Sequence, residues 1–211
     1  EKAQKRLGDA MTSMNEEVTT EQLRLNTLFE PLKRAKEGTE EWNNAKNKIV
    51  EQYGDYLNKL GIEITDVNTA RTAYQQLSRA ILDTARSRAM EKATTGAAET
   101  YAKTESEALK EIREQLYSQI GSGEKNLTAQ EAGKTWAQIR EAVRSGKDIP
   151  EEANAILQKL GTTMSTPEGK EYTTNYTLGY IQNRVVRSKR ARETYEQEMR
   201  EANALFGKAG N

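Results

Sequence analysis

The stretch that decides the fold covers residues 66–121 and reads DVNTARTAYQQLSRAILDTARSRAMEKATTGAAETYAKTESEALKEIREQLYSQIG. It contains no proline, and Gly96 is its one glycine before Gly121. Apolar or small residues recur every three or four positions, which is the period of a helix with one buried face. They are Ala70, Tyr74, Leu77, Ile81, Ala85, Ala89, Ala93, Ala97, Tyr101, Ala108, Ile112, Leu116 and Ile120. The pattern predicts a very long central helix over about 66–120, roughly 80 Å in length at about 1.5 Å per residue.

The middle of this helix carries small residues where its ends carry large ones. From 80 to 108 the buried line consists mostly of alanine, so a partner helix could approach closely there. We call this part the stalk and expect it to join two helical clusters. Gly96 is its candidate weak point, because glycine costs about 1 kcal/mol relative to alanine in a helix. The alternative is a compact bundle in which the long helix is broken.

A second long helix is predicted at the C-terminal end, over about 167–206. Thr166-Pro167-Glu168 has the composition of a helix start. Apolar positions then recur in alternating steps of three and four, which is a heptad register. They are Leu178, Ile181, Val185, Ser188, Arg192, Tyr195, Met199, Ala202 and Phe206, with Ser188 and Arg192 as polar interruptions. We expect coiled-coil-like packing of this helix on the stalk, and no strand pattern is evident.

Caps and breaks mark the shorter helices. A capping box, in which a hydroxyl and a Glu or Gln three residues later satisfy each other's backbone amides, is predicted at Thr19–Gln22 and at Thr128–Glu131. Other expected signals are Pro31 as a kink or restart, Thr39 as a cap, Gly38, Gly61 and Gly146 as ends, and Pro150 as the first residue of a helix through Leu160. The domain division that follows is 1–120, a Gly/Ser-containing linker at 121–127, and 128–211. The fold class is an all-α, elongated helical assembly.

Composition limits what these helices can enclose. Hydrophobic residues make up 35% of the 211 residues and charged residues 30%, whereas typical globular domains are about 45–50% apolar. The apolar residues of such a chain suffice for contacts between pairs of helices but not for a multilayered hydrophobic core. Disorder is the competing interpretation, and the sustained helical period argues against it. The sequence begins with Glu1 inside a helical pattern, so we expect a piece of a larger protein.

No catalytic, cofactor or metal site is predicted. The sequence has no histidine and no cysteine, so catalysis would need a carboxylate pair, a lysine or an activated serine. Its carboxylates occur in runs at Glu16-Glu17, Glu40-Glu41 and Glu151-Glu152, where helix ends explain them. Gly121-Ser122-Gly123 lacks the lysine of a phosphate-binding loop. We therefore expect no enzyme and no small-molecule substrate.

Nucleic-acid binding is the third hypothesis, and the charge pattern weighs against it. The net charge is zero, with 32 basic and 32 acidic residues. The basic run of Arg184, Arg187, Lys189, Arg190 and Arg192 spreads around its helix at about 100° per residue. We interpret this run as a solvated face, and we assign the two tryptophans and most tyrosines to the core. No stretch is long and apolar enough for a membrane span.

Several strings in the first half resemble tail tape-measure proteins of prophages in anaerobic gut bacteria. They are LRLNTLF at 23–29, AKEGTEEW at 35–42, IVEQYGDYL at 49–57 and LGIE at 60–63. The family continues with an Ala-Tyr-x-x-Leu segment, here 73–77, and an Ala-rich helix that leads to a tyrosine, here Tyr101. The resemblance covers roughly residues 15–120, and nothing comparable extends over 121–211.

The resemblance implies a structural segment of a protein that lies in the phage tail and sets its length. It further implies tail-assembly chaperones and tail-tube subunits as partners, with the host cytoplasm during assembly and then the lumen of the virion tail as the location. No catalytic residues are implied for this region. A generic bacterial coiled-coil interaction module, which could also self-associate through its helices, is the main alternative.

Overall fold

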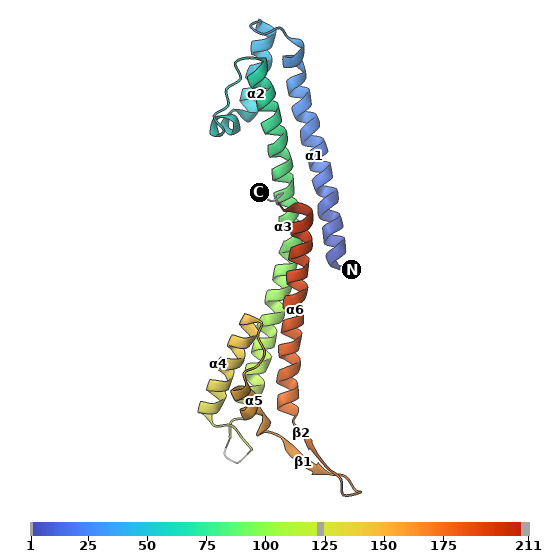
Figure 1. The fold of residues 1–211 in the computed structure, drawn as a ribbon, viewed down its shortest axis with the longest axis vertical. Helices are drawn as coiled ribbons and strands as arrows, with labels where there is room; N and C mark the ends of the chain where they lie inside the picture. The colour runs from blue at the N-terminus through green and yellow to red at the C-terminus, as the bar shows by residue number, and fades with distance from the viewer. Residues whose placement is uncertain (1, 122–124, 208–211) are drawn as a thin grey trace. The chain divides into compact units, whose positions relative to one another are not determined.

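The computed structural model describes residues 2–121 and 125–207, which form six helices and one β-hairpin (Figure 1). The all-α prediction is confirmed, including the two long helices. The elements are α1 (Lys2–Arg34), α2 (Glu40–Lys59), α3 (Val67–Tyr117), α4 (Ala129–Ser145), α5 (Glu151–Gln158), β1 (Thr162–Ser165), β2 (Glu171–Thr174) and α6 (Tyr176–Phe206).

Contacts divide the chain into two compact units. Unit 1 comprises Glu1–Thr94 with Glu201–Asn211, and unit 2 comprises Thr95–Arg200. Helices α3 and α6 therefore contribute residues to both units. The predicted linker at 121–127 includes 122–124, which lie outside the described residues, and the division of the sequence there stays a prediction.

Unit 1 has a core formed by α1, α2 and the first part of α3. Trp42 and Leu25 are buried there, and the Phe29 ring meets the Tyr74 ring edge-on with centroids 5.4 Å apart. The Thr39 hydroxyl caps α2 by accepting a hydrogen bond from the Trp42 amide at 3.3 Å, as predicted. Gly61 has a φ of +70° just beyond α2, in the left-handed conformation that glycine favours.

The predicted helix start at Thr19 and Gln22 is wrong, because α1 continues through both residues. A capping residue needs non-helical dihedrals, and neither residue is at a helix end. The Gln22 side chain instead donates to the Tyr74 hydroxyl at 3.0 Å and to Ser78 at 3.1 Å on α3. Pro31 lies within the last turn of α1 and does not restart the helix.

Helix α3 passes through Gly96 without interruption over 51 residues. Its alanine line is buried, with Ala85, Ala89, Ala93 and Ala97 each at most 5% exposed. In unit 1, Ala89 and Ala93 form a third cluster with Ala10 of α1 and with Ala202 and Phe206 of α6. The described residues thus contain three apolar clusters where two were expected, because α1 and α6 both reach the alanine line.

Unit 2 joins the C-terminal part of α3 to α4, α5, the hairpin and most of α6. Ile112 and Leu116 of α3, Ile139 of α4, Leu157 of α5 and Ile181 of α6 are completely buried together. The second predicted capping box is confirmed: the Glu131 amide donates to the Thr128 hydroxyl at 3.0 Å, and the Thr128 amide to the Glu131 carboxylate at 3.1 Å. Pro150 precedes α5 as its N-cap rather than as its first residue, and α5 ends at Gln158.

A β-hairpin occupies the place where the last helix was expected to begin. Strands β1 and β2 pair antiparallel, with Thr162 opposite Thr174 and Ser165 opposite Glu171. A proline disfavours helical dihedrals in the residue before it, and β-branched threonines favour strands. Gly169, with a φ of +83°, completes the turn, and Asn175 then caps α6 by accepting from the Leu178 amide at 3.0 Å.

The heptad line of α6 is confirmed from Leu178 onward. All nine predicted positions are buried or half-buried, including the polar Ser188 and Arg192. The stacked rings of Tyr101 and Tyr195, with centroids 5.4 Å apart, join α3 to α6 within unit 2.

Candidate functional site

The predicted carboxylate runs do not assemble into a reactive site. Glu40-Glu41 and Glu151-Glu152 occupy the first turns of α2 and α5, as expected. Glu16-Glu17 lies inside α1 rather than at a helix end, and Glu17 pairs with Arg88 of α3. The described residues contain no group of three or more acidic, histidine or cysteine side chains that could hold a metal ion. Nor does any helix among them have the length and apolarity to cross a membrane.

The basic run on α6 is largely engaged in contacts within unit 2. Arg184 forms an ion pair with Glu111 of α3 at 2.8 Å, and Lys189 forms one with Asp148 at 2.9 Å. The pair lowers the pKa of Asp148 and raises the pKa of Lys189, because each charged form is stabilised by the other. Arg192 donates to the Arg144 carbonyl. These three residues are thus half-exposed and at the same time paired within unit 2.

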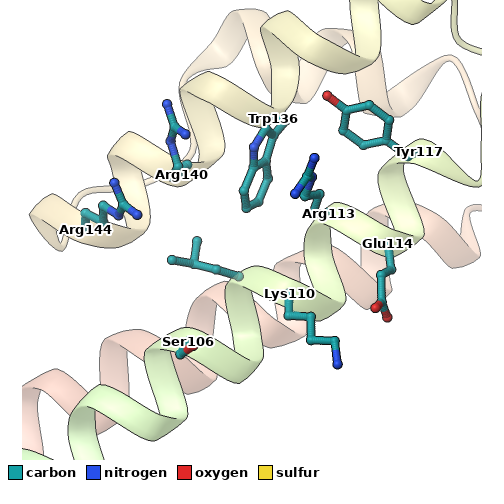
Figure 2. Close-up of a pocket in the computed structure, with 9 residues that line it drawn as sticks. Ser106, Lys110, Arg113, Glu114, Tyr117, Trp136, Arg140 and Arg144 are labelled. Carbon is teal, nitrogen blue, oxygen red and sulfur yellow. The ribbon is translucent and has the colours of Figure 1, made fainter.

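A pocket of about 830 Å³ lies between α3 and α4 (Figure 2). Ser106, Leu109, Lys110, Arg113, Glu114 and Tyr117 line it from α3, and Trp136, Arg140 and Arg144 line it from α4. The α4 residues follow steps of four, and the α3 residues recur at intervals of three or four as two neighbouring rows, so each set comes from one side of its helix. The pocket thus brings together charged and aromatic side chains that lie far apart in the sequence.

The polar character of this pocket is dominated by three arginines. Figure 2 shows Lys110 and Glu114 leaving the outer side of α3, where their opposite charges are four residues apart. Arg113, Arg140 and Arg144 are exposed and form no ion pair among the described residues. They leave a local surplus of positive charge in a chain whose net charge is zero.

Aromatic rings lie beside two of these arginines. The Arg113 guanidinium lies 5.6 Å from the centroid of the Tyr117 ring, and that of Arg140 lies 6.0 Å from the centroid of the Trp136 ring. These distances are within the range of cation–π attraction. Trp136 is half-buried and packs against the core of unit 2. The core contact limits the orientations that this ring can take and leaves part of it at the pocket.

Three acidic residues of unit 2 are held by partners of their own. Glu111 pairs with Arg184, and Glu152 accepts from both Lys134 and Gln138. The hydrogen bond from Lys134 is the main reason why the pKa of Glu152 is lowered. Glu131 is held in the capping box and by Lys159. These acids are therefore engaged away from the three arginines.

Sequence reasoning assigned both tryptophans to the core and missed this pocket. The assignment is confirmed for Trp42, which is 4% exposed, whereas Trp136 is divided between core and pocket. The assignment of most tyrosines to the core is wrong, because none of the nine is buried and four are exposed, namely Tyr56, Tyr117, Tyr172 and Tyr176. The available signal was the spacing of Trp136, Arg140 and Arg144 in steps of four, which places one aromatic and two basic residues on one helix face.

No family model matches this sequence, and no significant match exists among curated proteins or solved structures.

Proposed function

We propose that this chain is a structural segment of a bacteriophage tail tape-measure protein that helps to set tail length during assembly. The observation that supports it most is the uninterrupted course of α3 over 51 residues, through Gly96. The strings that resemble the family lie on α1, α2, the connections beside α2 and the first part of α3. The proposal includes tail-assembly chaperones and tail-tube subunits as partners, and no catalytic role.

The physical basis of the proposal is that a helix converts residue number into length. Each residue adds about 1.5 Å along a helix axis, so a continuous helical segment has a defined contribution to a measured distance. The alanine line of α3 supports this use, because small buried residues let neighbouring helices pack closely along it.

A length change in the parent gene tests this role. Tandem duplication of residues 67–102 adds 36 residues, or about ten helical turns. If tail length follows helix length, electron microscopy of the virions should show tails longer by about 54 Å. A control that exchanges exposed residues of the same stretch without changing its length should leave the tails unchanged.

Intact virions with unaltered tails after the duplication would contradict the proposal. An independent check is the genomic neighbourhood of the parent gene, where tail-tube and baseplate genes should lie close by. Their absence would favour the generic coiled-coil interaction module.

A further inference from the structure

We propose that the pocket between α3 and α4 binds a nucleotide unit, with its base stacked on Trp136 and its phosphates, or those of adjoining nucleotides, held by the arginines along the pocket, Arg113, Arg140 and Arg144. The unit can belong to a free nucleotide or to a single-stranded nucleic acid, since both present the same phosphate and the same flat base. This inference does not depend on the proposed structural function.

Three arginines of the pocket can contact phosphate groups. Arg140 and Arg144 extend from α4 at successive turns, and Arg113 approaches from α3 on the other side of the pocket. Guanidinium groups offer a planar fork of donors that matches phosphate oxygens, often in pairs of parallel hydrogen bonds. Because these groups have no carboxylate partner among the described residues, an anion would not have to displace an existing ion pair.

The aromatic side chains of the pocket offer flat surfaces on which a nucleotide base can stack. Figure 2 shows Trp136, Arg113 and Tyr117 near one another at one end of the pocket. A base stacked on an aromatic ring contributes about 1–3 kcal/mol, with little dependence on which base it is. An arginine beside the ring adds a second flat surface for stacking. A simple inorganic anion would leave these surfaces unused.

The dimensions favour a small unit over a folded partner. A volume of about 830 Å³ falls within the roughly 300–1,000 Å³ of typical small-molecule pockets. From Trp136 to Arg144 the α4 side extends over eight residues, or about 12 Å along the helix. Two or three nucleotides span such a distance, whereas the groove of a docked partner helix would extend over more turns.

The pocket is distinct from the basic run that the sequence made conspicuous. Arg184 and Lys189 of that run already hold Glu111 and Asp148. The scattered arrangement of that run and the net charge of zero weigh against nucleic-acid binding by α6. A local cluster of arginines from two other helices is free of both restrictions.

The binding test uses fluorescence anisotropy of a 5′-labelled oligothymidylate of eight residues, titrated with the unmodified chain at low and physiological salt. We expect saturable binding that weakens with salt, with a slope of about −0.7 per phosphate contact in a double-logarithmic plot. Competition by unlabelled ATP separates the two sources. Comparable affinity for ATP indicates a free nucleotide, and much tighter binding of the oligonucleotide indicates a strand.

A second readout reports on the stacking itself. Trp42→Phe leaves Trp136 as the one tryptophan of the chain, and oligothymidylate or ATP should quench its fluorescence on binding. Trp136→Leu should weaken binding by about tenfold or more, while Trp136→Phe should retain most of it. Unchanged affinity in Trp136→Leu would overturn the assignment of a base-stacking site.

Matched charge variants locate the binding. The double variant Arg140→Gln/Arg144→Gln removes two positive charges at the pocket, and Arg187→Gln/Arg190→Gln removes two from α6. The first should weaken binding by about tenfold or more, and the second should change it little. Equal losses in both variants, or no binding by the unmodified chain, would overturn the proposal. The helical circular dichroism of each variant is measured alongside, and the exposed arginines are expected to be replaceable without loss of helix.

Discussion

Gly146 is the residue at which a larger side chain would both strain the backbone and displace the Arg192 side chain. It ends α4 with a φ of +72°, and a Cβ there would lie 2.9 Å from Cδ of Arg192 on α6. We predict that Gly146→Ala lowers the free energy of unfolding of unit 2 by more than the roughly 1–2 kcal/mol expected for a left-handed non-glycine residue. Chemical denaturation followed by circular dichroism measures the change.

The control separates the backbone from the contact. In an Arg192→Ala background the same Gly146→Ala change should cost only the backbone part, so that the two substitutions are non-additive. Full additivity would show that Arg192 does not crowd this helix end.

Thr128 supports a second residue-scale prediction, because it holds one half of the capping box of α4. Thr128→Ala removes the acceptor for the Glu131 amide and should lower the free energy of unfolding by about 1 kcal/mol. Thr128→Ser keeps an acceptor at the same place and should preserve most of the stability. Thermal unfolding of both variants gives the comparison, and equal melting temperatures would show that this cap contributes nothing.

At the scale of the element, the alanine line of α3 determines how closely α1 and α6 approach in unit 1. Ala89 and Ala93 are 3% and 5% exposed. Ala89→Leu or Ala93→Leu should overpack this contact and cost about 1–3 kcal/mol. The control is Ala98→Leu at an exposed position of the same helix, where both residues are good helix formers. Denaturant unfolding in which all three variants match the parent would mean that no tight contact exists at Ala89 and Ala93.

The elements that sequence could predict were those with a long period or a local cap. The buried positions of α3 and α6 recur at a regular spacing over many turns, and the capping box at Thr128 needs only four residues. Thr19 and Gln22 have the same capping-box spacing, but they lie inside a continuous helix. There the Gln22 side chain forms hydrogen bonds to α3 and does not cap a helix start. The hairpin was missed because the Thr-Pro-Glu sequence of its turn, residues 166–168, also occurs at helix starts.

The pocket was less predictable than any element. A third of its lining comes from α4, and the spacing of those residues, Trp136, Arg140 and Arg144, is visible in the sequence. The face of α3 that lies opposite these α4 residues is determined by the packing of the unit 2 core around Ile139 and Ile112. That packing is long-range and cannot be obtained from either helix alone.

For the whole molecule, the titratable groups predict a stability that is nearly constant around neutral pH and decreases at both acidic and alkaline pH. No histidine is present, so we expect the melting temperature to change little between about pH 6 and 8. Hydrogen bonds from Thr69, Thr128 and Lys134 are the main causes of the lowered pKa values of Asp66, Glu131 and Glu152, respectively. Their contribution is present above the unfolded-state pKa values near 4 and is lost as the pH falls through the folded-state values.

At alkaline pH the sign is reversed. The raised pKa of Lys189, caused by Asp148, gives a contribution that is present at lower pH and lost as the pH rises through the folded-state pKa. Scanning calorimetry from pH 2 to 11 measures both decreases. Glu131→Gln keeps a capping side chain that does not titrate, so the melting temperature of this variant should fall less steeply at acidic pH. An unchanged acid dependence would assign the acid sensitivity to other groups.

The hairpin gives the molecule a place where sequence can be added without disturbing its cores. Every residue of β1 and β2 is exposed, and the turn between them is closed by hydrogen bonds among its own residues, such as that from the Gly169 amide to the Thr166 carbonyl at 2.9 Å. Loop tips of this kind tolerate insertions well. An epitope or a site for a fluorescent label placed at 167–169 would thus provide a handle for imaging this chain, with the buried seams of both units left intact.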